Sequence, residues 1–363
     1  MKVVTVVGAR PQFVKCAAVS RELRSLATEV LVHTGQHYDF NMSDVFFEEL
    51  EIPRPNYNLK VGSGSHGAQT GEMLRTIEEV LLTEDPQIVL LYGDTNSTLA
   101  GALAAAKLHI PVAHVEAGLR SFNRRMPEEI NRIVTDHVSS LLFCPTPTAV
   151  ENLRHEGITV GVSLVGDVME DSLLHGLAMS AQRSTILEQH SLRAGQYYLA
   201  TVHRAENTDD PHRLRQIIEG FKELGSLEVP VVFAVHPRTL PHLTRLGATQ
   251  LAGLICIEPM PFIDMIALES NAKAILTDSG GVQKEAAWLG VPCVTLRDET
   301  EWVETVASGW NLVVGTDPGK IISAARRPKP DRNVHQLRAG AASEVAKGIV
   351  GFSNQLISAG TRS

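Results

Sequence analysis

The sequence predicts an α/β protein built from two doubly wound parallel sheets. Short apolar runs rich in β-branched residues alternate with longer amphipathic stretches, which is the pattern of repeated strand–helix–strand units. The runs are apolar throughout rather than alternating with polar residues, so helices are expected on both faces of each sheet. The length of 363 residues exceeds one ordinary α/β unit and favours two domains.

The expected elements divide the chain near its middle. A helix is expected over residues 13–26, and a mostly helical polar stretch over 167–195 separates two sets of strands. The first domain is expected over residues 1–168, a second, nucleotide-binding domain over 169–340, and a final helix within 341–363. Strands are expected at 3–7, 30–33, 88–92, 112–115, 141–143 and 163–165, and then at 198–201, 231–235, 255–257, 274–277 and 293–296.

Composition excludes several classes of function. The net charge of -8 and the pI of about 6.0 give no field that would attract nucleic acid or an anionic membrane. The four cysteines lack the spacing of a zinc site and are expected to be reduced thiols. The chain begins with a strand rather than a signal peptide, and no apolar run reaches the roughly 18 residues of a membrane span. We expect a soluble cytoplasmic protein.

The turn after the first strand carries two cations. Gly8 frees the backbone, Pro11 suits a first helical turn, and Arg10 and Lys15 follow at an edge where ligands bind in such sheets. The two cations would bind a phosphate or hold a carboxylate. The alternative is a surface pair that only decorates the turn.

Acidic residues follow two neighbouring strands and a nearby loop. Asp94 and Glu116 stand at strand exits, although Asp94 also suits a helix cap or a turn. Pro127 precedes a helix whose first turn carries Glu128 and Glu129, and one of these glutamates is expected to be only a first-turn residue. A buried cluster of three acids would repel itself and raise some of their pKa values toward neutrality. The cluster therefore predicts proton transfer.

The second half of the chain offers basic strand exits. His203 and Arg204 follow one strand, and His236 and Arg238 follow the next. Together they suggest a basic wall for a diphosphate, although His236 equally suits a packed strand end.

A turn of small residues follows the strand at 274–277. Ser279, Gly280 and Gly281 open a helix there, a geometry that binds anions through backbone N–H groups, although the sequence is not a P-loop. Glu285 lies about one helical turn further on, where its carboxylate would accept hydrogen bonds from ribose hydroxyls. The alternative for Glu285 is a surface glutamate.

These motifs resemble the non-hydrolysing UDP-N-acetylglucosamine 2-epimerase family. The resemblance covers nearly the whole chain, at residues 8–15, 93–95, 114–120, 127–129, 203–204 and 277–281. It implies the glycosyltransferase-B fold, in which two Rossmann-like domains face a central cleft, with a C-terminal helix that crosses back to the first domain. It also implies a homodimer whose substrate is a UDP-N-acetylhexosamine, with no metal and no cofactor. In the family's reaction a base removes the sugar C2 proton as UDP leaves C1, and UDP then adds back to the bound 2-acetamidoglucal.

The same resemblance implies roles for residues of this chain. Asp94, Glu116 and Glu128 correspond to the acid/base set, and His203 to the histidine that steadies the departing diphosphate. Substrate binding is expected, from the resemblance or from the basic wall, of Arg10, Lys15, Arg132, Arg204, His236, Ser279, Gly280, Gly281 and Glu285.

Two departures from the family pattern leave open which sugar the substrate carries. Trp302 replaces an arginine that helps bind the nucleotide sugar, and the expected helix at 41–50 lacks the glutamine with which bacterial members bind an activating second nucleotide sugar. These two departures, together with the turn at 8–12 and the run at 122–124, are similar to the sequence of one branch of the family. That branch acts on UDP-2,3-diacetamido-2,3-dideoxy-glucuronate in surface-polysaccharide synthesis. A glycosyltransferase and a non-catalytic nucleotide-sugar sensor are the alternatives from other classes.

Overall fold

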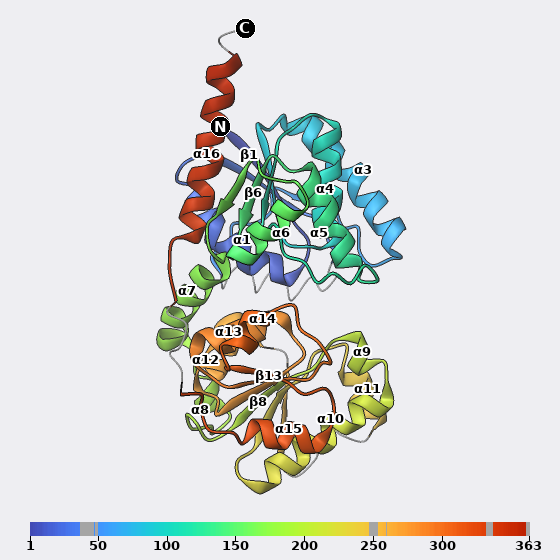
Figure 1. The fold of residues 1–363 in the computed structure, drawn as a ribbon, viewed down its shortest axis with the longest axis vertical. Helices are drawn as coiled ribbons and strands as arrows, with labels where there is room; N and C mark the ends of the chain where they lie inside the picture. The colour runs from blue at the N-terminus through green and yellow to red at the C-terminus, as the bar shows by residue number, and fades with distance from the viewer. Residues whose placement is uncertain (37–46, 48–49, 247–252, 259, 332–336, 361–363) are drawn as a thin grey trace. The chain divides into compact units, whose positions relative to one another are not determined.

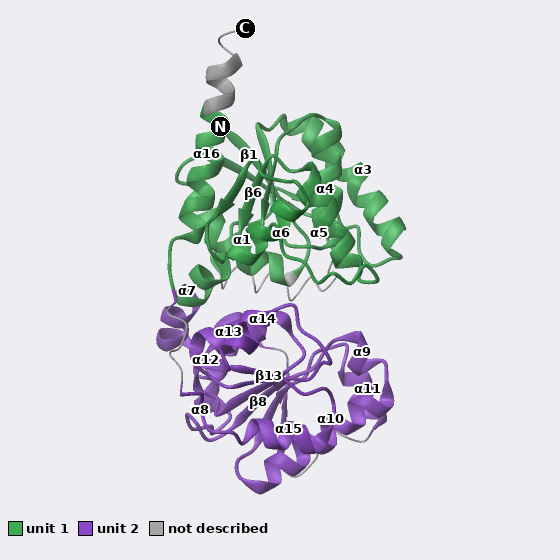
Figure 2. Ribbon diagram, viewed as in Figure 1, with its two compact units in different colours: residues 1–174, 338–363 green, residues 175–337 purple. Residues whose placement is uncertain are grey.

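The computed structural model describes residues 1–36, 47, 50–246, 253–258, 260–331 and 337–360, and of residues 10 and 355–360 it describes the backbone alone. The chain divides into two compact units (Figure 2). Unit 1 comprises Met1–Leu174 and Arg338–Ser363, and unit 2 comprises His175–Leu337. Unit 2 is thus an insertion into unit 1. These boundaries fall after Leu174 and Leu337, where the sequence analysis placed them after residues 168 and 340.

Unit 1 contains a seven-stranded parallel sheet in the order β3-β2-β1-β4-β5-β6-β7. Its strands are β1 (Lys2–Val7), β2 (Thr28–His33), β3 (Tyr57–Asn58), β4 (Ile88–Tyr92), β5 (Val112–Val115), β6 (Leu141–Cys144) and β7 (Val162–Leu164). The helices are α1 (Arg10–Leu23), α3 (His66–Glu84), α4 (Asn96–Lys107), α5 (Pro127–Val138), α6 (Pro147–His155), α7 (Val168–Arg183) and α16 (Ala341–Gly360). Helix α7 begins in unit 1 and ends in unit 2.

Unit 2 contains a six-stranded parallel sheet in the order β10-β9-β8-β11-β12-β13. Its strands are β8 (Tyr198–Thr201), β9 (Val231–Ala234), β10 (Leu254–Ile257), β11 (Ala274–Thr277), β12 (Cys293–Thr295) and β13 (Asn311–Val313). The helices are α8 (Ile186–Gln189), α9 (Ala205–Thr208), α10 (Pro211–Leu227), α11 (Leu240–Arg245), α12 (Phe262–Asn271), α13 (Gly280–Leu289), α14 (Val303–Ala307) and α15 (Pro318–Ala325).

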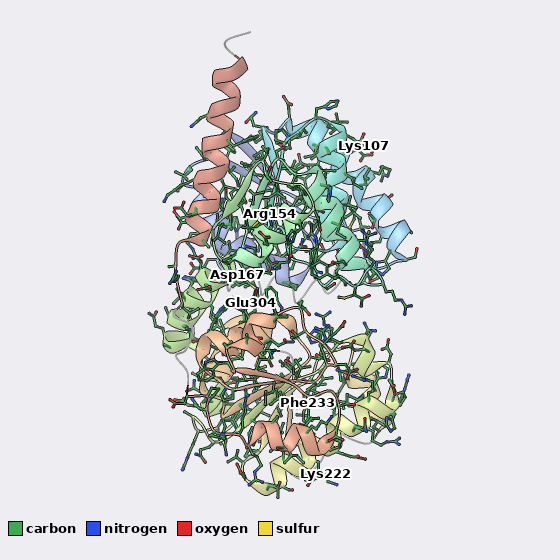
Figure 3. The ribbon with its side chains drawn as sticks, viewed as in Figure 1. Lys107, Arg154, Asp167, Lys222, Phe233 and Glu304 are labelled. Carbon is green, nitrogen blue, oxygen red and sulfur yellow. The ribbon has the colours of Figure 1, made fainter. Side chains whose placement is uncertain are left out.

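The cores form where helices cover the apolar strands. In unit 2, Phe233 of β9 is fully buried, whereas Lys222 of α10 projects from the surface (Figure 3). Burial of the central strands on both faces explains their continuous apolar sequences. No helix in the described part of the chain is long and apolar enough to cross a membrane.

Helix α16 completes unit 1 by packing beside α1 (Figure 1). Asp171 of α7 accepts hydrogen bonds from the backbone N–H groups of Gly340 at 2.6 Å and Ala342 at 3.2 Å, so a carboxylate from another helix satisfies donors at the start of α16. Further along, Gly348 allows close contact, because a Cβ there would lie 2.8 Å from a ring carbon of Phe143.

A buried carboxylate joins the exits of β4 and β5 to helix α5. Asp136 accepts hydrogen bonds from His114 Nδ1 at 2.7 Å, from Arg120 Nη1 at 2.7 Å and from the backbone N–H of Gly118 at 3.0 Å. His114 Nε2 lies 2.7 Å from the carbonyl oxygen of Gly93. Burial alone would raise the pKa of Asp136, but His114 and Arg120 hold this pKa below its ordinary value.

Several predicted boundaries differ from the structure. Helix α1 begins at Arg10 rather than residue 13, and α16 spans Ala341–Gly360, within the range 341–363 expected for the final helix. The sequence analysis missed β3 and β13, and the two residues of β3 are too few to give a periodic signal. The predicted helix at 41–50 lies almost wholly outside the described residues.

Because the pKa of Asp136 is depressed in the folded chain, its carboxylate stabilises unit 1 above its unfolded pKa of about 3.9. This contribution is lost as pH falls through the lower folded value. We expect Asp136→Asn to destabilise unit 1 by about 3–5 kcal/mol at pH 7 and to weaken the pH dependence of its stability in acid. Urea unfolding followed by far-UV circular dichroism measures this.

Tryptophan fluorescence gives an internal control, since Trp288, Trp302 and Trp310 all lie in unit 2. The fluorescence transition should move less than the dichroism transition. Glu151→Gln, which breaks an exposed ion pair with Arg154 in unit 1, should change neither by more than about 0.5 kcal/mol. An Asp136→Asn chain as stable as wild type would contradict the prediction.

Candidate active site

The exits of β1, β4 and β5 meet at one edge of the first sheet because these parallel strands are neighbours. The side chain of Gln12 joins two of them. Its Oε1 accepts from the backbone N–H groups of Gly8 at 2.8 Å and Ala9 at 3.1 Å, and its Nε2 donates to the carbonyl oxygen of Tyr92 at 2.9 Å. The sequence analysis did not identify this role, which needs knowledge of the strand order.

Glycine is required at position 8 because neighbouring side chains lie very close to its backbone. A Cβ at Gly8 would lie 2.1 Å from Ser97 Oγ and 2.2 Å from Thr34 Oγ1. The predicted ligand residue Arg10 begins α1 at the same turn, and its side chain is not among those that the structure describes. Lys15 lies on α1, 7% exposed.

Lys15 forms a buried ion pair with Glu116, which is also 7% exposed. The Nζ of Lys15 donates to Glu116 Oε2. Glu116 has φ of 72°, in the left-handed region that costs a non-glycine residue about 1 kcal/mol or more. The backbone N–H groups of Glu116 and Ala117 both donate to the carbonyl oxygen of Phe143 at 3.1 Å, which holds this conformation. Strain that is held in this way is typical of functional positions.

Asp94 pairs with Arg132. Arg132 Nη2 donates to Asp94 Oδ2 at 2.6 Å, and Arg132 Nη1 donates to Glu129 Oε2 at 2.8 Å. Asp94 lies in the turn after β4 and does not cap α4, since Thr95 is the N-cap and accepts from the backbone N–H of Thr98. Burial lowers the pKa of Arg132, but its carboxylate partners outweigh burial and raise it.

The two glutamates of α5 differ in their surroundings. Glu129 is 1% exposed and accepts from the backbone N–H groups of Ser121 at 2.9 Å and Phe122 at 2.8 Å, so it holds the loop before α5. Burial alone would raise the pKa of Glu129. These donors and Arg132 outweigh burial, so the pKa lies below its ordinary value. Glu128 is partly exposed and has no hydrogen-bond partner among the residues that the structure describes. Glu129 is therefore the structural member of the pair.

The acids of unit 1 are not a bare cluster of like charges. Asp94 and Glu116 each have a cationic partner, Arg132 and Lys15. Ion pairing thus offsets the mutual repulsion from which the sequence analysis argued. The arrangement still presents carboxylates beside cations at one sheet edge, which suits proton transfer next to an anionic substrate.

In unit 2, buried Asp278 fixes the loop that carries His203 and Arg204. Asp278 is 0% exposed, and its two carboxylate oxygens accept from the backbone N–H of His203 at 3.0 and 3.1 Å and of Arg204 at 3.0 Å. His203 Nδ1 lies 3.7 Å from Asp278 Oδ1. Asn207 Nδ2 also donates to Asp278 at 3.0 Å. The exits of β8 and β11 are thereby locked together.

The predicted basic wall is only partly assembled. The rings of His203 and His236 lie 5.3 Å apart, and His236 is exposed. Arg238, however, donates to Asp209 at 2.8 Å, and Arg204 Nη2 lies 3.8 Å from Glu301 Oε1. Both arginines therefore have acidic neighbours within unit 2.

The turn of small residues opens helix α13 as the sequence predicts. Ser279 is the N-cap, its backbone N–H donates to Thr277 Oγ1 at 2.9 Å, and its side chain makes no capping hydrogen bond. Gly280 and Gly281 form the first turn. Glu285 lies on the same helix and is 9% exposed, so the alternative of a surface glutamate is wrong.

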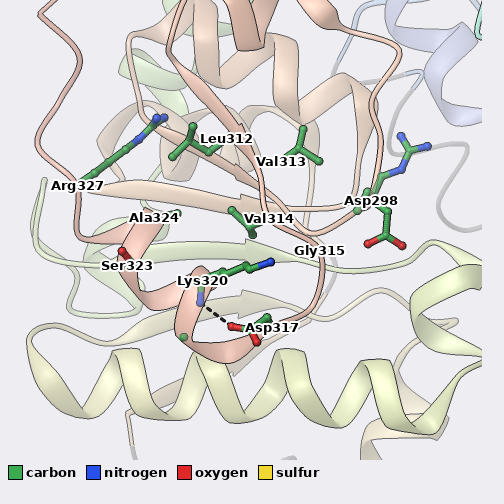
Figure 4. Close-up of a pocket in the computed structure, with 12 residues that line it drawn as sticks. Asp298, Leu312, Val313, Val314, Gly315, Asp317, Lys320, Ser323, Ala324 and Arg327 are labelled. Carbon is green, nitrogen blue, oxygen red and sulfur yellow. Dashed lines mark hydrogen bonds between the residues drawn. The ribbon is translucent and has the colours of Figure 1, made fainter.

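A separate cavity of about 870 Å³ lies along β13 and α15. Arg297, Asp298, Lys320 and Arg327 are among the residues that line it (Figure 4), and the carboxylate of Asp317 caps α15 there by accepting from the backbone N–H of Lys320 at 2.8 Å. The predicted site residues are not among those that line this cavity. Within the described ranges, no group of three His, Cys, Asp or Glu side chains is arranged to hold a metal ion.

Comparisons with known proteins agree with these motifs. The family model for UDP-N-acetylglucosamine 2-epimerase matches residues 21–347. A UDP-N-acetylglucosamine 2-epimerase homolog of Methanococcus maripaludis is 55% identical over 352 residues, which cover 96% of this chain and 98% of the relative. The UDP-2,3-diacetamido-2,3-dideoxy-D-glucuronate 2-epimerase of Pseudomonas aeruginosa is 53% identical over 331 residues, covering 90% and 92%.

A solved structure shows the same fold. The crystal structure of Methanocaldococcus jannaschii UDP-GlcNAc 2-epimerase in complex with UDP-GlcNAc and UDP matches with a TM-score of 0.89 and 43% identity, over 97% of this chain and 100% of the other. With the two parallel sheets, this match confirms the predicted fold class. The chain therefore belongs to the UDP-N-acetylglucosamine 2-epimerase family and is a nucleotide-sugar 2-epimerase, an isomerase.

Proposed function

We propose that this UDP-sugar 2-epimerase interconverts UDP-N-acetylglucosamine and UDP-N-acetylmannosamine. The observation that carries the proposal is the pair of adjacent strand exits in unit 1, where Glu116 lies beside Lys15 and Asp94 beside Arg132. Carboxylates move protons, and the neighbouring cations suit a substrate that carries a diphosphate. The relative from Methanocaldococcus jannaschii, with UDP-GlcNAc and UDP in its crystal structure, supports this substrate class.

The proposed reaction exchanges one proton at C2 without net change in redox state. A carboxylate of the set Asp94, Glu116 and Glu128 takes the C2 proton, the C2–H electron pair forms the C1=C2 double bond, and the C1–O pair leaves with UDP. The UDP oxygen then adds back to C1 of the 2-acetamidoglucal while a second acid delivers a proton to the opposite face of C2. Two proton carriers are therefore needed.

The residues of unit 1 suit a reaction that needs two proton carriers. Glu116 is held by the Phe143 carbonyl and by Lys15, so its carboxylate is positioned before substrate arrives. Lys15 compensates the charge of Glu116 while it is a carboxylate. Glu128 is partly exposed and lacks a hydrogen bond among the described residues, so it is accessible as a second carrier.

The residues of unit 2 suit binding of the UDP group. Ser279, Gly280 and Gly281 offer backbone N–H groups to the phosphates at the start of α13, and Glu285 offers a carboxylate to the ribose hydroxyls. His203, held in place by Asp278, stabilises the charge that develops on the departing diphosphate.

A second candidate substrate is UDP-2,3-diacetamido-2,3-dideoxy-glucuronate. It is favoured by the Pseudomonas aeruginosa relative at 53% identity, which is closer in sequence than the Methanocaldococcus jannaschii relative at 46%. Trp302 also stands where the resemblance expects an arginine that binds the nucleotide sugar.

Solvent exchange tests the reaction. In D2O, purified protein should interconvert the gluco and manno epimers, and NMR or mass spectrometry should find one deuterium at C2 of the product, because the proton that is returned comes from an exchanged carboxyl group. Product that keeps protium at C2 would exclude the mechanism. Free UDP that accumulates in step with turnover would indicate a hydrolysing enzyme instead.

Glu116→Gln should lower the exchange rate by about 10²–10⁴-fold, because the amide cannot take up the proton. UDP binding, measured by calorimetry, should change little. Glu151→Gln, an exposed site in the same unit, is the matched control and should keep full activity. Since Glu116→Gln leaves the buried Lys15 ammonium without its partner carboxylate, the circular dichroism spectrum should be checked first. A folded, fully active variant would remove Glu116 from the proton-transfer set.

The two substrates should be assayed side by side with one enzyme preparation. We expect a higher kcat/KM for UDP-N-acetylglucosamine than for the diacetamido-glucuronate. The reverse order would assign the enzyme to the second substrate and leave the proposed chemistry unchanged.

A further inference from the structure

The indole of Trp302 lies directly on the turn that opens α13. A Cβ at Gly280 would lie 2.9 Å from Trp302 Nε1 and 2.7 Å from Glu301 Oε1. Position 280 must therefore be glycine for both side chains to approach the backbone. Trp302 Nε1 is thus placed beside the first backbone N–H groups of α13.

Hydrogen bonds within unit 2 fix this arrangement. Thr300 Oγ1 donates to Gln283 Oε1 at 2.6 Å and accepts from the backbone N–H of Trp302 at 3.1 Å. Arg297 Nη1 donates to Glu301 Oε2 at 2.8 Å. The segment is therefore anchored both to α13 and to the exit of β12, and the indole is positioned without a ligand.

A buried lysine lies against the face of the indole. Lys284 of α13 is 3% exposed, and its Nζ lies 4.0 Å from the centroid of the Trp302 ring and 5.4 Å from that of Trp288. A cation over an aromatic face is attracted to the ring and draws electron density from it. The N–H of Trp302 is consequently a stronger donor than that of an isolated indole.

That N–H has no acceptor among the residues that the structure describes. Among the described residues, Trp302 donates through its backbone N–H, to Thr300 Oγ1, and its ring contacts Lys284. Buried indole N–H groups ordinarily have a partner. Here the half-buried donor lies next to Gly280, where backbone N–H groups already favour an anion.

We propose that Trp302 Nε1 donates a hydrogen bond to a phosphate oxygen of the substrate diphosphate at the Ser279–Gly281 turn. Lys284 is the positioning residue, since it holds the indole and supplies positive charge behind it. This inference rests on the proposed binding of the UDP group to that turn. The indole N–H, with the buried lysine against its ring, then makes the phosphate contact that an arginine side chain would make directly.

The test compares UDP with uridine as ligands of the full-length protein, by calorimetry. Trp302→Phe keeps an aromatic ring over Lys284 but removes the N–H. We expect UDP to bind about tenfold more weakly to this variant and uridine to bind unchanged, because uridine has no phosphate. Lys284→Met should weaken UDP by about threefold and again leave uridine unchanged. Trp288→Phe, whose ring centroid lies 5.4 Å from Lys284 Nζ and which stands further along α13 from the turn, is the matched control and should bind both ligands as wild type does.

Each result decides one point. Wild-type binding of UDP by folded Trp302→Phe, or an equal loss for UDP and uridine, would overturn the phosphate contact. A weakened Trp302→Phe beside an unaffected Lys284→Met would overturn the role of the lysine. Failure of the wild-type protein to bind UDP at all would instead overturn the proposed function.

Discussion

The buried carboxylate of Asp136 is the contact on which the candidate site in unit 1 depends. It binds His114 on β5, Arg120 beyond that strand and the backbone of Gly118, while His114 reaches the carbonyl of Gly93. The turn that carries Asp94 and the loop that carries Glu116 are thereby held by one network. Because an unpaired group in this network would be costly at such burial, its members have little freedom to move separately.

Unit 2 uses the same principle at different positions. Asp278 accepts backbone hydrogen bonds from the loop of His203 and Arg204, and it immediately precedes Ser279. The histidine and the small-residue turn are therefore set by one side chain. In both units a buried aspartate supports the residues proposed to contact substrate, so charged groups are oriented before the reaction rather than during it.

The sequence predicted the fold well because parallel strands buried on both faces have a strong apolar signal. It also placed Asp94, Glu116, His203 and the turn at Ser279 directly after strands, where the structure has them, since polar residues and glycines that follow apolar strands are easily recognised. The sequence offered Lys15 as a residue that would bind a phosphate or hold a carboxylate, and Lys15 pairs with Glu116. The pairing of Arg132 with Asp94 could not be predicted, because it depends on how α5 lies against the β4 exit. Asp136 and Lys284 were missed for the same reason: both lie within helices, where sequence alone does not show what a side chain contacts.

The insertion of unit 2 into unit 1 has a consequence for how the protein is made. Helix α16, which covers α1, is synthesised only after the whole of unit 2. At about 5–20 residues per second, the nascent first unit waits on the order of ten seconds with this face of α1 uncovered. Unit 2 can reach its native state while α16 has not yet been made, whereas unit 1 completes its fold only after α16 has left the ribosome.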